Sequence, residues 1–351
     1  MPSQTCNANW DRAHPQLPKT FMNGVILDAD SLGLGMDLSP ITTQLSGWSV
    51  YAATSQEDLF DRIETAEVVL TNKVILSRTA LRHAKQLKHI SVMATGTNNI
   101  DLGAASEQGI SVSNAAGYAT PSVSQHVLTL MLNLATNMPR YLQDTQAGQW
   151  QKSPVFCRLD HPIIELSGKT LGIIGLGELG LAVGKLATAF GMTVIAASAQ
   201  AIPSSAPTPT NIVRCDLPTL LQRADVVSLH CPLTTDTEHL IDAASLAVMK
   251  PSAFLINTAR GALVDSQALL DALEAGHIAG AAVDVLAIEP PTLQEALLQI
   301  HRPNLLITPH NAWGALESRQ RLIQQMADNI RGFCANTPVR QVNAAGPLKH
   351  S

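Results

Sequence analysis

The stretch Lys-Thr-Leu-Gly-Ile-Ile-Gly-Leu-Gly-Glu-Leu-Gly, residues 169–180, constrains the fold more than any other part of the chain. It predicts a short strand buried on both faces, a tight glycine turn and the first turn of a helix, and its last six residues complete G-x-G-x-x-G. In such a turn the first glycine permits a sharp reversal, the second lets the backbone approach a pyrophosphate, and the third lets the helix pack on the strand. The N–H groups at the helix start then face the phosphates.

Three glycines alone could serve packing only, so the neighbouring sequence decides the interpretation. A helical stretch at 181–190, a stop at Gly191 and an apolar run at 193–197 supply the strand–turn–helix–strand context. The sequence therefore predicts a dinucleotide-binding turn. The residues of this turn expected at the cofactor are Gly175, Gly177, Glu178, Leu179 and Gly180.

Composition limits the class of protein. The 351 residues are enough for two domains, and 46% hydrophobic with 4% aromatic and 15% charged residues is typical of a soluble α/β protein. A net charge of −5 without a basic tract argues against a nucleic-acid surface. No apolar run reaches the roughly 18 to 20 residues that span a bilayer, so no membrane association is expected.

The cysteines and histidines show no site pattern. The five cysteines are scattered without a C-x-x-C pair, which favours reduced thiols and a cytoplasmic location. The eleven histidines lack ligand spacing, so no metal is predicted. Residues 1–21 have no apolar core of a signal peptide, and we expect a disordered arm there, with Met22 as an alternative start.

Alternating apolar runs and helical patterns predict a first, smaller domain. Strands are expected at 25–27, 48–53, 68–70, 90–94 and 110–113, with helices at 56–64, 79–87 and 101–108. Five strands with intervening helices within about 115 residues favour a flavodoxin-like parallel α/β domain. A boundary at 117–121 precedes a long apolar helix at 122–141, which we expect to connect the two domains.

The second half predicts a larger, doubly wound sheet. Its strands are expected at 171–174, 193–197, 226–230, 254–257, 281–285 and 305–308, its helices at 181–190, 242–249, 266–275 and 293–299, and a loop at 200–210. An amphipathic helix at 318–333 should fold back on the first domain. The prediction is thus a Rossmann nucleotide domain, residues 118–316, inserted into a flavodoxin-like substrate domain, residues 22–117 and 317–351.

Chemically active side chains follow three strands of the second sheet. Arg260, Glu289 and His310 come after the strands at 254–257, 281–285 and 305–308. Arg260 can hold a substrate carboxylate or carbonyl, His310 can exchange a proton with the carbonyl oxygen, and Glu289 can orient the imidazole. Taken singly, Arg260 also fits a surface ion pair, Glu289 an acid at a helix start, and His310 a loop histidine. Because parallel strands deliver all three to one edge, we predict a site for reducing a 2-oxo acid.

At these residues the chain resembles the D-isomer-specific 2-hydroxyacid dehydrogenase family, from about Val25 to Phe333. The motifs that carry the resemblance are the glycine turn, Thr95-Gly96-Thr97-Asn98-Asn99-Ile100-Asp101, His230-Cys231-Pro232-Leu233-Thr234, Asn257-Thr258-Ala259-Arg260-Gly261, Asp284 with Glu289-Pro290, and Thr308-Pro309-His310. The resemblance implies a catalytic triad of Arg260, Glu289 and His310, and substrate binding at Ala94, Thr95 and Gly96.

The resemblance also implies further contacts with the cofactor. Asp284 would meet the nicotinamide carboxamide, and the remaining cofactor residues would be His230, Cys231, Pro232, Thr237, Thr258 and Ala259. From the residues alone, Cys231 and Pro232 also fit a turn that ends a strand. Asp284 equally fits a core acid whose hydrogen bonds are satisfied within the protein.

Within the family, the 94–98 loop and His310-Asn311-Ala312-Trp313-Gly314 look most like the bacterial glycerate dehydrogenases, also called hydroxypyruvate reductases. Trp313 would then line the substrate pocket, or serve as a packing aromatic. This implies hydride transfer between NAD(P)H and a small 2-oxo acid, and a homodimer. The alternatives are a dinucleotide-sensing regulator or corepressor on the same fold, or a formate or phosphite dehydrogenase.

The residue expected to distinguish NAD from NADP departs from the usual pattern. Where an NAD-specific enzyme places an acid on the adenosine ribose, this chain has Ser198. No carboxylate there would repel a 2′-phosphate, and Arg214 could approach one. The sequence therefore predicts relaxed or NADP-tolerant cofactor use, with NAD versus NADP unresolved.

Overall fold

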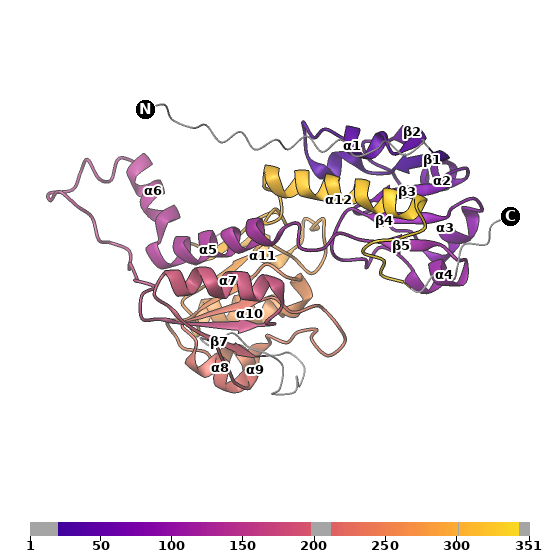
Figure 1. The fold of residues 1–351 in the computed structure, drawn as a ribbon. Helices are drawn as coiled ribbons and strands as arrows, with labels where there is room; N and C mark the ends of the chain where they lie inside the picture. The colour runs from indigo at the N-terminus through magenta and orange to yellow at the C-terminus, as the bar shows by residue number, and fades with distance from the viewer. Residues whose placement is uncertain (1–19, 198–211, 301, 344–351) are drawn as a thin grey trace, which may run out of the picture. The chain divides into compact units, whose positions relative to one another are not determined.

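The computed structural model describes residues 20–197, 212–300 and 302–343, and its chain divides into two compact units (Figure 1). Unit 1 comprises residues 1–116 and 320–351, and unit 2 comprises residues 117–319. Each unit contains one parallel sheet with helices, as the predicted two-domain α/β fold class requires. Ser198 lies outside the described residues, as do residues 1–19 of the predicted N-terminal arm.

Unit 1 is built on a five-stranded sheet of order β2-β1-β3-β4-β5, the flavodoxin-like order. Its strands are β1 (Thr20–Ile26), β2 (Leu45–Val50), β3 (Val68–Thr71), β4 (His89–Val92) and β5 (Ser111–Ser113). Its first helices are η1 (Ala29–Leu32), α1 (Ser39–Thr42), α2 (Leu59–Ile63), α3 (Arg78–His83) and α4 (Leu102–Glu107). Asp101 caps α4 by accepting a hydrogen bond from the Ala104 N–H. Neither η1 nor α1 was predicted.

The final helix, α12 (Leu316–Cys334), packs on the sheet of unit 1 from Gln320 onward. Asn329, fully buried, donates hydrogen bonds of 2.9 Å to Ser91 Oγ and to the Asn114 carbonyl. The chain therefore returns to its first unit after completing the second, which confirms the predicted fold-back.

His89 in β4 is buried in this interface between sheet and helix, and it predicts a pH dependence of stability. Its ring stacks on Phe333 with centroids 4.6 Å apart, its Nδ1 lies 3.1 Å from Ser111 Oγ, and its Nε2 has no partner among the described residues. Burial lowers the pKa of His89 to about 3 from 6.5. Below pH 6.5 this histidine is protonated in the unfolded chain but stays neutral in the folded one. The free energy of unfolding therefore falls as pH drops below 6.5.

At pH 5 this group costs about 2 kcal/mol of stability relative to pH 7.5. Urea titrations at both pH values should show that the free energy of unfolding decreases less between pH 7.5 and pH 5 for His89→Leu than for the wild type. The pKa of His230 is also lowered by burial. Because His230 is present in both proteins, it contributes equally to the pH dependence of each. An identical loss in the variant would contradict the assignment.

Unit 2 is built on a seven-stranded sheet of order β12-β11-β10-β9-β6-β7-β8. Its strands are β6 (Thr170–Ile174), β7 (Thr193–Ala197), β8 (Ile212–Arg214), β9 (Val226–Leu229), β10 (Phe254–Asn257), β11 (Gly280–Val283) and β12 (Leu305–Ile307). The order reverses between β6 and β9, so the ligand crevice of a doubly wound sheet is expected at the carboxyl ends of these strands.

Helices cover both faces of this sheet, which confirms the doubly wound prediction. One face packs against α5 and α7, and the other against α8, α9 and α10. The bounds of these elements are α5 (Thr120–Thr136), α7 (Glu178–Ala189), α8 (Leu217–Arg223), α9 (Ala243–Ala247), η2 (Gly261–Leu263), α10 (Ser266–Ala275) and α11 (Ala296–Gln299). Strand β8 and helix α8 were not predicted. β8 gives a weak signal, because it has three residues and only one of them is buried.

The predicted single helix at 122–141 was wrong. The chain instead forms α5, a left-handed residue at Asn137 with φ 50°, and a separate helix α6 (Met138–Gln146) that turns away from α5 (Figure 1). Pro139 explains the break, because its ring would clash with the carbonyl of Ala135 in a continuous helix. The apolar face of α5 is buried in the core of unit 2, whereas α6 buries no residue.

Candidate active site

His310 and Glu289 form a hydrogen-bonded pair at the carboxyl edge of the sheet in unit 2. The imidazole Nδ1 lies 2.6 Å from Glu289 Oε2, and Glu289 Oε1 accepts the Leu286 N–H at 3.0 Å. Both side chains are about one-third exposed, at 30% and 31%. The carboxylate therefore fixes the ring through Nδ1 and leaves Nε2 for proton exchange.

The backbone that carries His310 is held by Asp284, a buried carboxylate at the end of β11. Asp284 accepts hydrogen bonds from Thr308 Oγ1, from Asn311 N–H and from Ala312 N–H, the last two at 3.0 Å. The His310 N–H also donates to the Asp284 carbonyl at 2.8 Å. Asp284 is therefore a buried acid whose hydrogen bonds are satisfied within the protein, which was one of the two interpretations of this residue. Its contact with nicotinamide stays a prediction.

Arg260 follows β10 in a loop that is fixed by Asn257. The buried Asn257 side chain donates to the Arg260 carbonyl at 2.8 Å and accepts the Ala259 N–H at 3.0 Å. The Arg260 guanidinium donates to the Ala259 carbonyl at 2.6 Å. Among the described residues the guanidinium has this one hydrogen-bond acceptor, so most of its five N–H groups remain available for an anion.

The three predicted catalytic residues line one cavity of about 250 Å³ within unit 2. The full lining is Leu233, Arg260, Gly261, Ala262, Val285, Leu286, Ala287, Glu289 and His310. A larger cavity, about 410 Å³, lies at the amino ends of β10, β11 and β12, and none of the predicted site residues lines it. Because ligands of such sheets bind at the carboxyl ends, the smaller cavity is the candidate active site.

Two aromatic side chains stand next to this site. Trp313 donates its indole N–H to the His310 carbonyl at 3.0 Å and packs against the core of unit 2. Its ring meets that of Tyr118 edge-on, with centroids 6.5 Å apart. Burial raises the pKa of Tyr118 to about 12, while the nearby charge of Arg260 lowers it. Trp313 therefore braces the His310 loop, and its contact with substrate stays a prediction.

The glycine turn after β6 has the geometry that a pyrophosphate requires. A side chain at Gly175, where φ is 98°, would lie 2.6 Å from Cys231 N, and one at Gly180 would lie 2.4 Å from the Gly175 carbonyl oxygen. At Gly177, by contrast, a Cβ would have no atom of the described residues within 4 Å. The turn thus packs tightly against the protein at Gly175 and Gly180, whereas its backbone at Gly177 is accessible to a ligand. The first N–H groups of α7 have no acceptor within the helix, so the residues present fit a bound dinucleotide.

Several other predicted cofactor residues follow β9 and β10. Thr258 Oγ1 is buried without a partner among the described residues, as expected of a hydroxyl that meets a ligand. Thr237 donates to the Pro232 carbonyl at 2.8 Å and shapes the loop after Cys231, whose thiol pKa is raised by burial. Desolvation lowers the pKa of the neighbouring His230 to about 4, so its imidazole is neutral at pH 7.

The predicted substrate loop belongs to unit 1 and follows β4. The Ala94 carbonyl accepts the Ala115 N–H at 3.0 Å, and the Thr95 carbonyl accepts Asn114 Nδ2 at 2.7 Å. Asn99 Nδ2 reaches the carbonyls of residues 72 and 74. These contacts fix a loop at the carboxyl end of β4, with Gly96 between Thr95 and the Asn99 anchor.

Comparison with known proteins identifies the family. A sequence profile described as the NAD binding domain of D-isomer specific 2-hydroxyacid dehydrogenases matches residues 128–312. A Haemophilus influenzae protein named putative 2-hydroxyacid dehydrogenase is 43% identical over 290 residues, which are 82% of this chain and 90% of that protein. The chain belongs to this family. The cofactor is accordingly a nicotinamide dinucleotide, and the predicted family resemblance is confirmed.

Other comparisons agree with this D-2-hydroxyacid dehydrogenase assignment. The glycerate dehydrogenase of Methylorubrum extorquens is 43% identical over 288 residues, which are 82% of this chain and 89% of that protein. The solved structure of the TT0316 protein from Thermus thermophilus matches with a TM-score of 0.79 and 31% identity, over 92% of this chain and all of that one.

Some residues at the candidate site were not assigned a role from the sequence. Asn257 holds the Arg260 loop, and the polar end of an otherwise apolar strand was the available signal. Tyr118 beside Trp313 had no signal, because it follows the boundary glycine without any pattern. Within the described residues no group of three or more His, Cys, Asp or Glu could hold a metal ion. Nor is any helix there long and apolar enough to cross a membrane.

Proposed function

We propose that the protein reduces hydroxypyruvate or glyoxylate with NAD(P)H, reversibly toward D-glycerate or glycolate. The observation that carries this proposal is the shared cavity of Arg260, Glu289 and His310, with the imidazole held by the carboxylate at 2.6 Å. The similarity to a glycerate dehydrogenase over most of both chains supports the choice of substrate.

In this mechanism His310 donates a proton from Nε2 to the carbonyl oxygen of the substrate, and takes it back in the reverse direction. Glu289 keeps the ring oriented and stabilises its charged form, while Arg260 binds the substrate oxygens. The dinucleotide, when bound, supplies the hydride for the substrate C2. The amides at Gly177, Glu178 and Leu179 hold its pyrophosphate.

The remaining roles in this proposal are assigned from the sequence motifs. Backbone amides at Thr95 and Gly96 bind the substrate carboxylate, with Ala94 and Trp313 lining the pocket. His230, Cys231, Pro232 and Thr237 lie along the adenosine side, and Thr258 and Ala259 meet the cofactor at the end of β10. Each role follows from the motif that carries the residue. Unit 1 is thus the substrate domain and unit 2 the nucleotide domain.

A panel of hydroxypyruvate, glyoxylate, pyruvate and bulkier 2-oxo acids with both reduced cofactors tests this function. We expect the highest kcat/KM for hydroxypyruvate or glyoxylate, and turnover with NADH and NADPH within about a hundredfold of each other. This cofactor tolerance follows from Ser198, which supplies no carboxylate against a 2′-phosphate. A preference for NADH above a hundredfold would reject the tolerance. Dinucleotide binding without turnover of any 2-oxo acid would instead fit a sensor, and oxidation of formate or phosphite would reassign the substrate.

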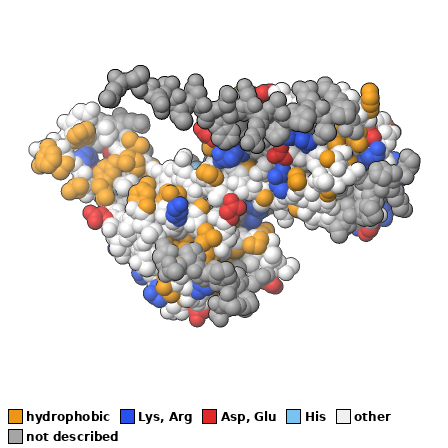
Figure 2. Space-filling view, viewed as in Figure 1, with side chains coloured by type: hydrophobic (Ala, Val, Ile, Leu, Met, Phe, Trp, Pro, Cys, Tyr) orange, Lys and Arg blue, Asp and Glu red, His pale blue; other side chains and the backbone are white. Residues whose placement is uncertain are grey.

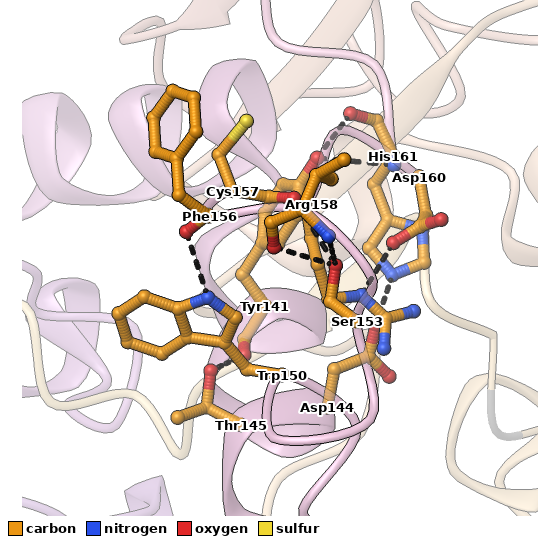
Figure 3. Close-up of polar contacts among 11 residues, drawn as sticks. Tyr141, Asp144, Thr145, Trp150, Ser153, Phe156, Cys157, Arg158, Asp160 and His161 are labelled. Atoms are coloured by element: carbon orange, nitrogen blue, oxygen red, sulfur yellow. Dashed lines mark hydrogen bonds and ion pairs between the residues drawn. The ribbon is translucent and has the colours of Figure 1, made fainter.

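The protein acts as a homodimer in this proposal, and the surface that supports it is the arm, residues 148–165, together with α6. Asp144 of α6 holds the arm, because its Oδ2 lies 2.9 Å from His161 Nε2 and 4.0 Å from the Arg158 guanidinium (Figure 3). Tyr141 also donates to the His161 carbonyl at 2.7 Å. A polar cluster thus fixes the conformation of a segment that has no apolar core of its own.

The apolar side chains of α6 and the arm are exposed, and Figure 2 shows hydrophobic side chains gathered on this part of the surface. They are Met138, Leu142, Trp150, Val155, Phe156, Leu159 and Ile163. A contiguous exposed apolar patch is typical of an interface, and a two-fold axis would let the same patch serve both subunits. The arm and α6 together are therefore our candidate dimer surface.

The double change Phe156→Ser and Leu159→Ser should shift the protein from dimer to monomer in sedimentation equilibrium, because these two side chains are 89% and 76% exposed and central to the arm. Leu34→Ser is the matched control, since Leu34 is 93% exposed but lies in unit 1. A monomeric wild type, or a double variant that stays dimeric, would contradict the proposal. A cytoplasmic location is also proposed, in line with the free thiols of Cys157, Cys215 and Cys231.

A further inference from the structure

The glycine turn carries an acid at the position where α7 begins. Glu178 is the first residue of α7, directly after the open Gly177, and its side chain is exposed. Its Oε1 accepts a hydrogen bond of 2.7 Å from Thr120 Oγ1. Thr120 is the first residue of α5, so this bond joins the amino ends of two helices in unit 2.

A second contact places the carboxylate against the segment by which the chain enters unit 2. A side chain at Gly117 would lie 2.9 Å from Glu178 Oε1 and 3.3 Å from Oε2, and Gly117 has φ 66°. Gly117 is also the first residue of unit 2. Glu178 is therefore held in a niche formed by Gly117 and Thr120, to one side of the turn.

The charge of Glu178 has opposite effects with and without a dinucleotide. An acid in the first turn stabilises a helix through the helix dipole. The same helix start would receive the pyrophosphate, which carries negative charge of its own, and like charges a few ångströms apart repel. A carboxylate here therefore favours the free protein over the complex, and the Thr120 bond limits this effect by holding the charge aside.

We propose that Glu178 sets the cofactor affinity of this protein: its carboxylate weakens binding of the dinucleotide pyrophosphate, and Thr120 holds that carboxylate away from it. The inference rests on the proposed cofactor role of the glycine turn. Glu178 acts as a positioning and affinity-tuning residue, and takes no part in hydride or proton transfer. Its consequence is faster release of the dinucleotide after each turnover.

The first test is the Kd of NADH, measured by nicotinamide fluorescence on the full-length protein. Glu178→Gln removes the charge but keeps an oxygen that can accept from Thr120, and we expect Kd to fall about threefold to tenfold. The gain should shrink toward onefold as salt rises from 0.02 M to 0.5 M, because salt screens a repulsion between exposed charges. Glu178→Asp keeps the charge and should not tighten binding. A gain that is independent of salt, or no gain, would overturn the proposal.

The second test is a double-mutant cycle with Thr120→Val. Alone, this change should raise the Kd of NADH about twofold to threefold, because the carboxylate loses its partner and is free to approach the phosphates. In the Glu178→Gln background it should have no effect. Equal effects in both backgrounds would show that Thr120 acts only on the helix start, and would overturn its assigned role.

Two probes separate this inference from the proposed function. ADP-ribose retains the pyrophosphate and should respond to Glu178→Gln as NADH does, whereas adenosine lacks it and should not respond. If NADH and ADP-ribose fail to bind the wild type, the cofactor role of the turn is wrong. If both bind but the variant changes neither, only the role of Glu178 is wrong.

Discussion

Replacement of His310 by alanine is expected to lower kcat by a factor of about 10² to 10⁴, the range that general acid–base catalysis contributes. We assign proton exchange with the substrate to this imidazole. Among the described residues that line the cavity, the other titratable side chains are Glu289 and Arg260. The Kd of NADH should stay within about threefold of the wild-type value, because the glycine turn that we assign to the pyrophosphate follows a different strand.

His277→Ala provides the matched control, since His277 is an exposed histidine of unit 2 that does not line the cavity. Its kcat should equal that of the wild type. The kcat of Glu289→Gln should lie between those of His310→Ala and His277→Ala, because the amide can still contact Nδ1 but no longer stabilises a charged ring. Near-normal turnover of His310→Ala with the preferred 2-oxo acid would reject the assignment of the general acid.

Much of the fold could be predicted because its strands are buried on both faces. Runs such as Phe254–Asn257 are almost wholly apolar, and the structure has that strand and helix Ser266–Ala275 at the predicted bounds. Where burial is partial the pattern fails, as in β8, which was missed. The apolar period of α5 continued as far as Met138, so only the local geometry of Asn137 and Pro139 could reveal that the helix ends.

The candidate site was predictable to the level of the strand ends. Parallel strands deliver the residues that follow them to one edge, which is why Arg260, Glu289 and His310 could be grouped from sequence. The bond between His310 and Glu289 is a contact between loops from two strands, and their spacing of 21 residues carries no information about it. The same holds for Asp284, whose carboxylate serves backbone amides 27 and 28 residues away.

Gly261 is a further residue whose importance only the packing shows. A Cβ at this position would lie 1.9 Å from the carbonyl carbon of Leu286 and 2.3 Å from the nitrogen of Ala287. Both atoms are backbone, so no side-chain rotation can relieve the clash. Gly261 follows Arg260, and the Leu286 N–H is bound by Glu289, so the close approach connects the loops of two predicted catalytic residues.

Gly261→Ala should therefore destabilise the protein and impair the site together. We expect the free energy of unfolding to fall by about 3 kcal/mol, at the upper end of overpacking effects. For a unit of this size that corresponds to a decrease of roughly 6 to 12 °C in Tm. At temperatures where the variant is still folded, kcat should fall at least tenfold, because moving Leu286 displaces the carboxylate that orients His310.

Gly276→Ala is the control for this prediction. Gly276 ends α10 with φ 70°, and no atom of the described part of the chain lies within 4 Å of its Cβ position. It should cost about 1 kcal/mol from backbone strain alone and leave kcat unchanged. Thermal melts and steady-state kinetics on the two variants separate the contributions. If Gly261→Ala matched Gly276→Ala in both measurements, the two loops would have room to part, and their close packing would not be what holds Arg260 and Glu289 in one cavity.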